Sequence, residues 1–473
     1  MPRRSPRHLP SLVLVLSLSV ALSGAPARGL APDRGSAGIG DSYFPVDGNG
    51  GIDVRRYRVV NRYEFGRGRL SGHTVVTLRA TQDLSAFNLD FLLPVRQVRI
   101  DGQRVPHRRS SRHELTVEPM TALVAGEFVD VRVDYAGRPG RISWRGESNW
   151  LADRHEVVAM NQPHMAPWWF PANDHPRDKA RMDISITVPA GRQVLANGRP
   201  VSRTRQGRLV THRWRATEPM ATYLATFAAG RFEVRTGVRD GLPWRIAVSK
   251  RLSAGSRRAN LRLMRRTPRV VAALERVLGD YPFDTVGGLV TSLPVGFALE
   301  NQTLPTYPET GAGYTWLVVH EVAHQWFGDS VSLRHWRDIW LNEGPATYLE
   351  LWYDAQRGGG SPGSWLRREY ESRPAGAAFW RTRIGDPGAD GIFSGPVYLR
   401  GAMTFQALRN RIGTDAFWTL LRRWVREKRG GHGTREQFEA LAEEVSGQNL
   451  EAFFVAWLDA AERPADTAVN GLG

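Results

Sequence analysis

The chain has 473 residues, enough for two or three domains with buried cores. Its formal net charge is +17, and it contains no cysteine, which excludes disulfides, thiol catalysis and cysteine-ligated metal sites. Only three of its 64 basic residues are lysines, and the arginines are scattered without any nucleic-acid-binding motif. We therefore expect no nucleic-acid partner.

The first 27 residues have the pattern of a secretory signal peptide. Arginines precede an apolar run, residues 11–22, that is too short to span a bilayer comfortably. Ala25-Pro26-Ala27 then places small residues where a signal peptidase cleaves. We expect cleavage after Ala27, a secreted chain and no stable membrane insertion afterwards. The alternative is an uncleaved membrane anchor.

Residues 38–236 have the pattern of a β-sheet domain. Apolar and polar residues alternate most clearly over 129–135 and 182–188, which predicts half-buried antiparallel strands. Turn-forming pairs separate such runs, at Asp101-Gly102, Ala136-Gly137 and Asn197-Gly198. We interpret this part of the chain as an N-terminal antiparallel β-sheet domain.

Residues 237–473 are richer in helical patterns. The expected elements are a helix over 261–278, a strand over 287–291, a helix from 434 to about 445 and a helix over 450–459. Thr434 and Gln437 form a capping-box pattern at the start of the third of these. We expect residues 465–473 to be a frayed tail. The strongest chemical motifs lie in this second domain.

One helical stretch carries a pattern of metal ligands. His320 and His324 are four residues apart, so both rings lie on one face at a spacing that suits zinc. Glu321 lies about a quarter-turn away, where its carboxylate can take a proton from a water molecule at the open position of zinc. Apolar neighbours indicate that the helix is buried, and buried histidines need partners such as a metal. The alternative is two solvent-facing histidines on an amphipathic helix.

A catalytic zinc site needs a third protein ligand. Eighteen residues separate His324 from Glu343, which lies in the sequence WRDIWLNEGPATYLE, and HQWFGD overlaps the first motif. This combination resembles the M1 family of gluzincin metallopeptidases, the aminopeptidase N group, and in particular its short secreted bacterial forms. The resemblance implies one zinc ion per chain, with His320, His324 and Glu343 as ligands and Glu321 as catalytic base.

Two residues of the predicted ligand helix are of further interest. Glu350 lies seven positions after Glu343, on the same helical face, and could orient a ligating histidine. An exposed carboxylate is the alternative for Glu350. Pro345 departs from the family pattern, and we expect it to kink the helix.

The resemblance also implies roles for residues outside the zinc motif. Residues 296–301, GFALEN, look like the family's G-x-M-E-N loop, in which the glutamate pairs with the free α-ammonium of the substrate. Glu300 and Asn301 are therefore predicted to bind substrate, and Gln162 occupies the place of a glutamine with a similar role. The alternative for Glu300 is a carboxylate without a ligand.

The segment VYLRGA, residues 397–402, resembles the family's V-Y-x-K-G-A motif, with Arg400 in place of lysine. This likeness implies that Tyr398 donates a hydrogen bond to the oxyanion as it forms.

The resemblance implies a multi-domain β plus α/β fold. A saddle-like antiparallel β domain (38–236) would precede a thermolysin-like catalytic domain (237–473). The implied reaction is hydrolysis of the N-terminal peptide bond, with peptides as partners. The alternatives are an endopeptidase or an epoxide hydrolase on the same zinc frame, or a non-catalytic binding protein with a relic site. The intact ligands and Glu321 disfavour the relic.

Overall fold

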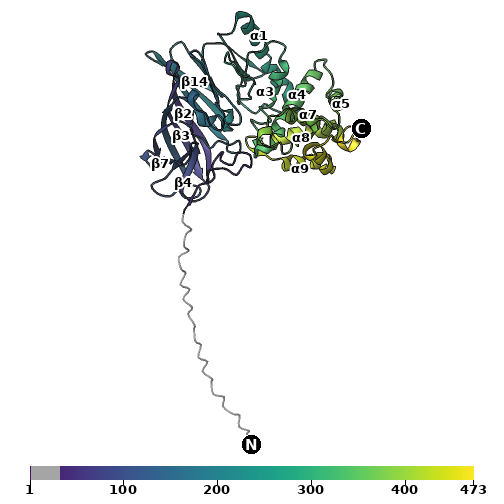
Figure 1. The fold of residues 1–473 in the computed structure, drawn as a ribbon, viewed down its shortest axis with the longest axis horizontal. Helices are drawn as coiled ribbons and strands as arrows, with labels where there is room; N and C mark the ends of the chain where they lie inside the picture. Colours follow the sequence, from purple (N-terminus) through teal and green to yellow (C-terminus); the bar gives the residue numbers. More distant parts are fainter. Residues whose placement is uncertain (2–31) are drawn as a thin grey trace.

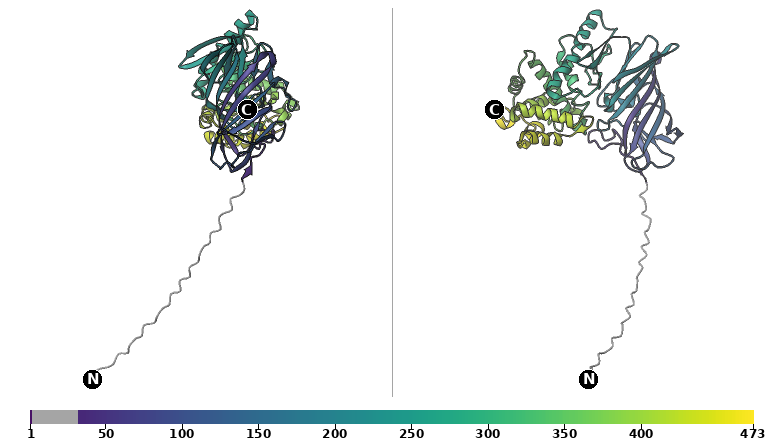
Figure 2. Two further views of the ribbon diagram at one scale, coloured as in Figure 1. Left: turned by 90° about the vertical axis from the view of Figure 1, so that its left-hand side faces the viewer. Right: turned by 180° about the vertical axis from the view of Figure 1, so that it is seen from behind.

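The computed structural model describes Met1 and residues 32–473 (Figure 1). The predicted signal peptide, residues 1–27, lies outside the described residues apart from Met1. β-sheets form one side of the molecule and helices the other, and Figure 2 shows the same arrangement from behind. This order, sheets first and a helical domain second, confirms the predicted fold class.

A twisted eight-stranded sheet is the main element of the β unit. The alternation over 129–135 and 182–188 is confirmed, because Val131 and Ile184 are buried and their sequence neighbours are partly exposed. Every pairing in this sheet is antiparallel except that of β12 with β2. In spatial order its strands are β14 (Arg199–Gln206), β15 (Leu209–Met220), β12 (Ala180–Pro189), β2 (Ile52–Glu64), β3 (Arg69–Ala80), β9 (Phe128–Gly137), β5 (Val95–Ile100) and β6 (Gln103–Arg104).

Two smaller four-stranded sheets complete the β unit. One contains β1 (Asp33–Arg34), β4 (Leu84–Asp90), β8 (Glu114–Val117) and β7 (His107–Arg109) in that order. The other contains β10 (Trp150–Ala152), β11 (Val157–Ala159), β16 (Phe227–Gly230) and β13 (Gln193–Ala196).

The second unit begins with a sheet of its own. Its strands are, in order, β17 (Phe232–Arg239), β18 (Leu242–Ser249), β19 (Val286–Val290) and β20 (Thr306–Tyr307). The predicted domain boundary between residues 236 and 237 falls inside β17. Because β17 pairs with β18 along its whole length, we place the start of the second unit at Phe232 instead.

Helices make up most of the remaining second unit. They are α1 (Ala254–Met264), α2 (Thr267–Leu278), α3 (Thr315–Ala323), α4 (Trp340–Ala355), α5 (Pro362–Ser372), α6 (Ala378–Arg381), α7 (Gly395–Ile412), α8 (Thr414–Glu427), α9 (Arg435–Ser446) and α10 (Glu451–Phe454), with β21 (Ser332–Leu333) and β22 (His432–Gly433) paired between them. Among the described residues, no helix is both long enough and apolar enough to traverse a bilayer.

The single helix predicted over 261–278 is wrong, because the structure has two helices there. α1 ends at Met264 and α2 begins at Thr267, with Pro268 in its first turn. A proline ring clashes with the carbonyl four residues earlier and lacks the N–H of a helical bond, so it favours a helix start over a helix interior. The capping box at Thr434 and Gln437 is confirmed at the start of α9.

Two other local predictions are also wrong. Ala136-Gly137 does not form a turn but ends β9, and a Cβ on Gly137 would lie 2.7 Å from Leu93 Cδ2, so the glycine allows close packing. The C-terminal tail is packed rather than frayed. Leu472 is buried, and the indole N–H of Trp457 donates to the carbonyl of Asn470 at 3.0 Å.

A buried arginine fastens α7 to this C-terminal segment. The guanidinium of Arg400 is fully buried and donates to five main-chain carbonyl oxygens, those of Trp380, Thr382, Ala456, Ala460 and Glu462, at 2.8–3.4 Å. Burial lowers the pKa of Arg400 to about 10, so the side chain stays charged at neutral pH. Its planar fork spreads one charge over acceptors that would otherwise be unsatisfied.

We predict that Arg400→Lys destabilises the protein, although the family motif carries lysine at this place. A single ammonium cannot reach all five carbonyls, so the free energy of unfolding should fall by about 1–3 kcal/mol. Differential scanning calorimetry should show a clearly lower midpoint than for Arg422→Lys, a control at an exposed position of α8. Equal midpoints for the two variants would contradict the proposed role of Arg400.

Candidate metal centre

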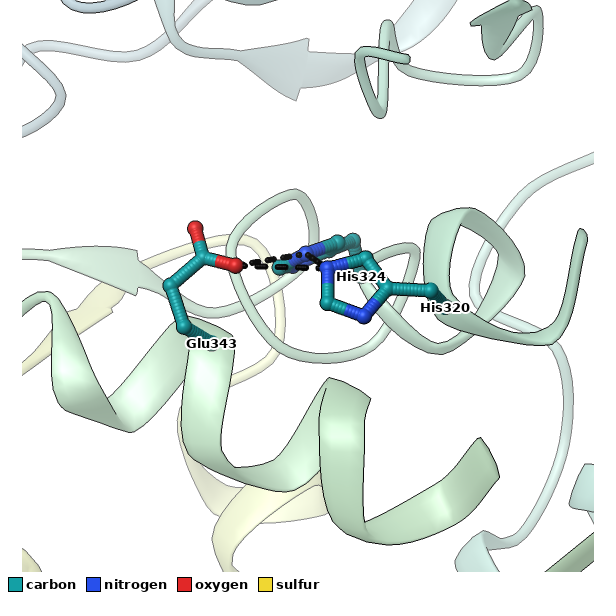
Figure 3. A group of neighbouring side chains, drawn as sticks. All are labelled: His320, His324 and Glu343. Atoms are coloured by element: carbon teal, nitrogen blue, oxygen red, sulfur yellow. Dashed lines mark hydrogen bonds and ion pairs between the residues drawn. The ribbon is translucent and has the colours of Figure 1, made fainter. Parts of the chain in front are cut away.

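The three predicted zinc ligands lie together between α3 and α4. His320 belongs to α3, His324 caps its C-terminal end, and Glu343 lies in the first turn of α4. Glu343 Oε2 is 3.3 Å from Nε2 of each histidine, and the two Nε2 atoms are 3.0 Å apart. Figure 3 shows the three side chains pointing toward one another. All three are buried.

The outer nitrogens of both rings fix the tautomers. Nδ1 of His320 lies 2.6 Å from Glu350 Oε1, and Nδ1 of His324 lies 3.0 Å from the carbonyl oxygen of Phe327. Both acceptors require an N–H on Nδ1, so each ring in its neutral form, the form that binds a metal, has its lone pair on Nε2. Two nitrogen lone pairs and a carboxylate oxygen therefore converge on one point, and a cation is what such a set accommodates. Two histidines and one carboxylate are a ligand set of catalytic zinc sites.

Glu350 was open to two interpretations in the sequence, and its contact with His320 favours the orienting role. Pro345 does not interrupt α4, which runs continuously from Trp340 to Ala355. The helix is thus continuous through Pro345, and the kink expected there stays a prediction.

Close contact between two glycines sets the distance from α4 to α7. A Cβ on Gly401 would lie 2.9 Å from Gly344 Cα, which leaves no room for a side chain, and a Cβ on Gly344 would lie a tight 3.2 Å from Gly401 Cα. Gly344 follows the ligand Glu343, and Gly401 follows Tyr398 by three residues, nearly one turn of α7. This contact brings the ring of Tyr398 over that of His320, with centroids 6.0 Å apart and an interplanar angle of 23°.

A cavity of about 560 Å³ opens beside the ligands. His320, Glu321 and Tyr398 line it, and the rest of its wall is mostly apolar and comes from Phe297, Ala298, Pro308, Tyr314, Trp316, Leu317 and Leu399, with Gly296, Glu309, Thr310, Thr347 and Glu350. Glu321 therefore faces space that a substrate can enter and is next to the ligands without being one of them. The cavity reaches the ligand set at His320.

The ionisation of Glu321 depends on its neighbours. Burial raises the pKa of Glu321 to about 8, while the nearby histidines act in the opposite direction. A bound dication would add to the effect of the histidines and favour the carboxylate, which is the form that accepts a proton. Burial and the charge of Glu343 keep the pKa of the Tyr398 phenol above its ordinary value, so Tyr398 remains a hydrogen-bond donor.

Glu300 lies close to the ligand set and is held from the β unit. Its Oε1 accepts from Gln162 Nε2 at 3.2 Å and from the hydroxyl of Tyr223 at 3.0 Å. Burial raises the pKa of Glu300, and the charge of Glu343 contributes to the same shift. Both donors are neutral, so neither balances the charge of the carboxylate. Sequence patterns did not identify Tyr223, because its contact with Glu300 joins positions far apart in the chain.

Asn301, which is predicted to bind substrate, makes a side-chain hydrogen bond to the β unit. The side chain is fully buried, and its amide donates to the main-chain carbonyl of Leu224 at 3.1 Å. Asn301 therefore fixes the loop that carries Glu300. Its Oδ1 makes no hydrogen bond among the described residues, and the predicted contact with a substrate stays a prediction.

Comparisons with known families agree with this geometry. The sequence model of the peptidase M1 N-terminal domain matches residues 98–224, and that of the peptidase family M1 domain matches residues 312–457. The second match contains all three ligands. The chain belongs to the peptidase M1 family.

Solved structures and curated sequences show the extent of this similarity. The M1 zinc metallopeptidase from Deinococcus radiodurans is 29% identical, with a TM-score of 0.82 over 90% of this chain and 98% of the other. A probable M1 family aminopeptidase 2 from Encephalitozoon cuniculi is 27% identical over 64% of this chain and 38% of its own length. Human glutamyl aminopeptidase is 31% identical over 41% of this chain and 22% of its own length. The chain thus spans well under half of these curated relatives.

We predict that Glu350→Gln weakens metal binding by this M1 chain. The substitution removes the carboxylate that holds Nδ1 of His320, and losing such an outer partner typically costs about 10–100-fold in metal affinity. Competition with a chromogenic chelator would measure the change. Glu371→Gln, at an exposed position of α5, is the matched control. Equal affinities in both variants would show that Glu350 does not support the ligand.

Proposed function

We propose that the chain is a zinc-dependent aminopeptidase that hydrolyses the N-terminal bond of peptides. The observation that carries this proposal is the convergence of three lone pairs beside a free carboxylate, Glu321, at the wall of an open cavity. A zinc ion at this point supplies a Lewis acid for the scissile carbonyl and makes a water molecule acidic near neutral pH. One ion per chain fits the single set of ligands at this cavity.

The chain's own residues then have separate tasks. Glu321 accepts the proton of the attacking water and delivers it to the leaving amine. Tyr398 donates its phenolic hydrogen to the oxygen of the carbonyl as negative charge develops there. Glu350 and the carbonyl of Phe327 hold the two histidines in the required tautomer.

Glu300 supports cleavage at the N-terminal end rather than within a chain. A carboxylate this deeply buried needs a cation, and its neighbours Gln162 and Tyr223 are neutral. The α-ammonium of a free peptide would be that cation. Two observations from similar proteins support this choice. The curated relatives are named aminopeptidases, and a mutant of the Deinococcus enzyme was solved with a Tyr-Ser-Ala substrate.

We also propose that the mature protein is secreted after cleavage behind Ala27. This part of the proposal rests on the order of arginines, apolar run and small residues in the first 27 residues. N-terminal sequencing of protein exported by a bacterial host would test it, and a mature chain that retains the apolar run would overturn it.

The first prediction for this function concerns the base. Glu321→Gln keeps the size of the side chain but cannot accept the proton, so turnover should fall by about 10²–10⁴-fold. Zinc content, measured by elemental analysis, should equal that of the wild type. Glu444→Gln, on the exposed side of α9, serves as control. A Glu321→Gln enzyme that keeps a tenth of the turnover would remove Glu321 from the role of base.

The second prediction concerns Glu300 and uses a matched pair of peptides, one with a free amine and one N-acetylated. Losing one side of a buried ion pair costs about 2–5 kcal/mol, so Glu300→Ala should lower kcat/KM on the free peptide by about thirtyfold or more. The acetylated peptide should be a poor substrate for both enzymes. If wild type cleaves both peptides equally and the variant affects both alike, the enzyme is an endopeptidase.

A further inference from the structure

A second buried cluster of ligand-type side chains lies in the β unit, between β4 and β8. Asp90 is the last residue of β4, Glu114 is the first of β8, and the two pair directly across the antiparallel sheet. His113 immediately precedes Glu114. Directly opposed residues project to the same side of a sheet, so strand pairing brings the two carboxylates together. The imidazole of His113, just before β8, lies against both of them. None of the three lines the cavity at the catalytic centre.

The spacing of the three groups is that of a metal site. Nδ1 of His113 lies 3.5 Å from Asp90 Oδ1 and 3.5 Å from Glu114 Oε1, and ligand atoms of all three residues lie within 4.8 Å of one another. Atoms about 3.5 Å apart are typical neighbours around an ion with ligand distances of about 2.0–2.2 Å. The distances between ligand atoms at the catalytic centre, 3.0–3.3 Å, are similar.

These atoms lack hydrogen-bonding partners of their own. Across the part of the chain that the structure describes, Asp90 Oδ1, both Glu114 oxygens and both ring nitrogens of His113 make no hydrogen bond. The three residues are at most 3% exposed. The other oxygen of Asp90 is already engaged, by the amide of Asn49 at 3.2 Å and the N–H of Asp174 at 2.6 Å. Leaving several buried polar atoms unpaired is costly, so the cluster requires a ligand or protons.

The charges around the cluster leave two carboxylates to be balanced. His164 lies nearby between Asp47, at 2.5 Å, and Glu147, at 2.9 Å. Although burial opposes it, these two carboxylates raise the pKa of His164 to about 10, so His164 is a cation that is already paired. Asp90 and Glu114 have no such partner among the ion pairs of the described residues except His113. A dication with a neutral imidazole would balance both.

The ring of His113 is also held in place as a metal ligand would be. It stacks on the indole of Trp144, with centroids 4.1 Å apart and an interplanar angle of 10°. Stacking orients the ring without using either nitrogen, so both remain available to a ligand.

We propose that Asp90, His113 and Glu114 bind a divalent transition-metal cation, such as zinc or manganese, at a second site. One nitrogen and two carboxylate ligands suit such ions better than calcium or magnesium, which prefer oxygen ligands only. The ion cross-links β4 to β8 and has a structural role, because the site is closed to substrates. The competing state is a cluster neutralised by protons, since burial raises the pKa of Glu114 to about 7.

The experiment counts metal in full-length protein whose catalytic ligands have been removed. The variant with His320→Ala and His324→Ala is incubated with zinc, desalted and examined by elemental analysis. We expect about one zinc ion per chain, about two in wild type, and close to none when Glu114→Gln is added to the double variant. Glu118→Gln, just beyond β8, is the matched control and should leave the count unchanged. A parallel series with manganese tests the other ion.

Three outcomes would overturn the proposal. The first is a double variant that retains neither zinc nor manganese, which means that protons neutralise the cluster. The second is an unchanged count after Glu114→Gln. The third is an unchanged thermal midpoint when zinc is added to the double variant, because an ion that cross-links two strands stabilises the folded state. If Glu114→Gln does not fold, the first and third outcomes still test whether the second site binds a metal ion. The catalytic zinc site is tested separately, by the difference in zinc content per chain between the wild type and the double variant.

Discussion

The catalytic centre depends on the burial of three lone pairs that face one another. Nε2 of His320, Nε2 of His324 and Oε2 of Glu343 come within 3.0–3.3 Å, a distance at which they repel unless a proton or a metal cation lies among them. Helical spacing provides the two histidines, but Glu343 comes from a different helix. The arrangement therefore requires α3 and α4 to pack in one defined relation. The glycine contact between α4 and α7 then extends this relation to Tyr398.

The loop that carries Glu300 is fixed from both units, and this couples the amine site to the metal site. From the catalytic side, Gln325, next to ligand His324, donates to the carbonyl of Glu300 at 2.9 Å and accepts from the N–H of Thr303 at 2.8 Å. From the β unit, Asn197 donates to the carbonyl of Gln302 at 2.8 Å. The distance between a bound ammonium and the zinc ligands is thus set by a short chain of hydrogen bonds. In the proposed function, a rigid distance of this kind would select the first peptide bond of a substrate.

Much of the catalytic centre could be predicted from sequence because several of its residues lie a few positions apart in the same helix. The four-residue spacing of His320 and His324 and the seven-residue step from Glu343 to Glu350 each follow from helical geometry. Contacts that join distant segments were beyond such reasoning. Tyr223 reaches Glu300 across 77 residues, and nothing in its neighbourhood marks it.

The wrong predictions of the helix over 261–278, the turn at Ala136-Gly137 and the frayed tail have similar causes. The apolar periodicity continues across Pro268, so the helix start there was missed. The packing of the C-terminal tail depends on Trp457, whose partner is a main-chain carbonyl. Every residue carries a main-chain carbonyl, so a sequence pattern does not show which carbonyls accept such hydrogen bonds. Ala136-Gly137 was misinterpreted because glycine serves both turns and close contacts, and only the position of Leu93 distinguishes the two.

The two acidic–histidine clusters of this chain follow one physical rule with different results. In both, folding removes water from carboxylates and imidazoles and brings them together, so a cation lowers the free energy of the folded state. At His320 the surrounding residues leave a cavity with Glu321 on its wall, so the cation can meet a substrate. At His113 the indole of Trp144 covers one face of the ring, and the carboxylates end two paired strands. A cation there has only the protein to bind, and its effect is confined to stability.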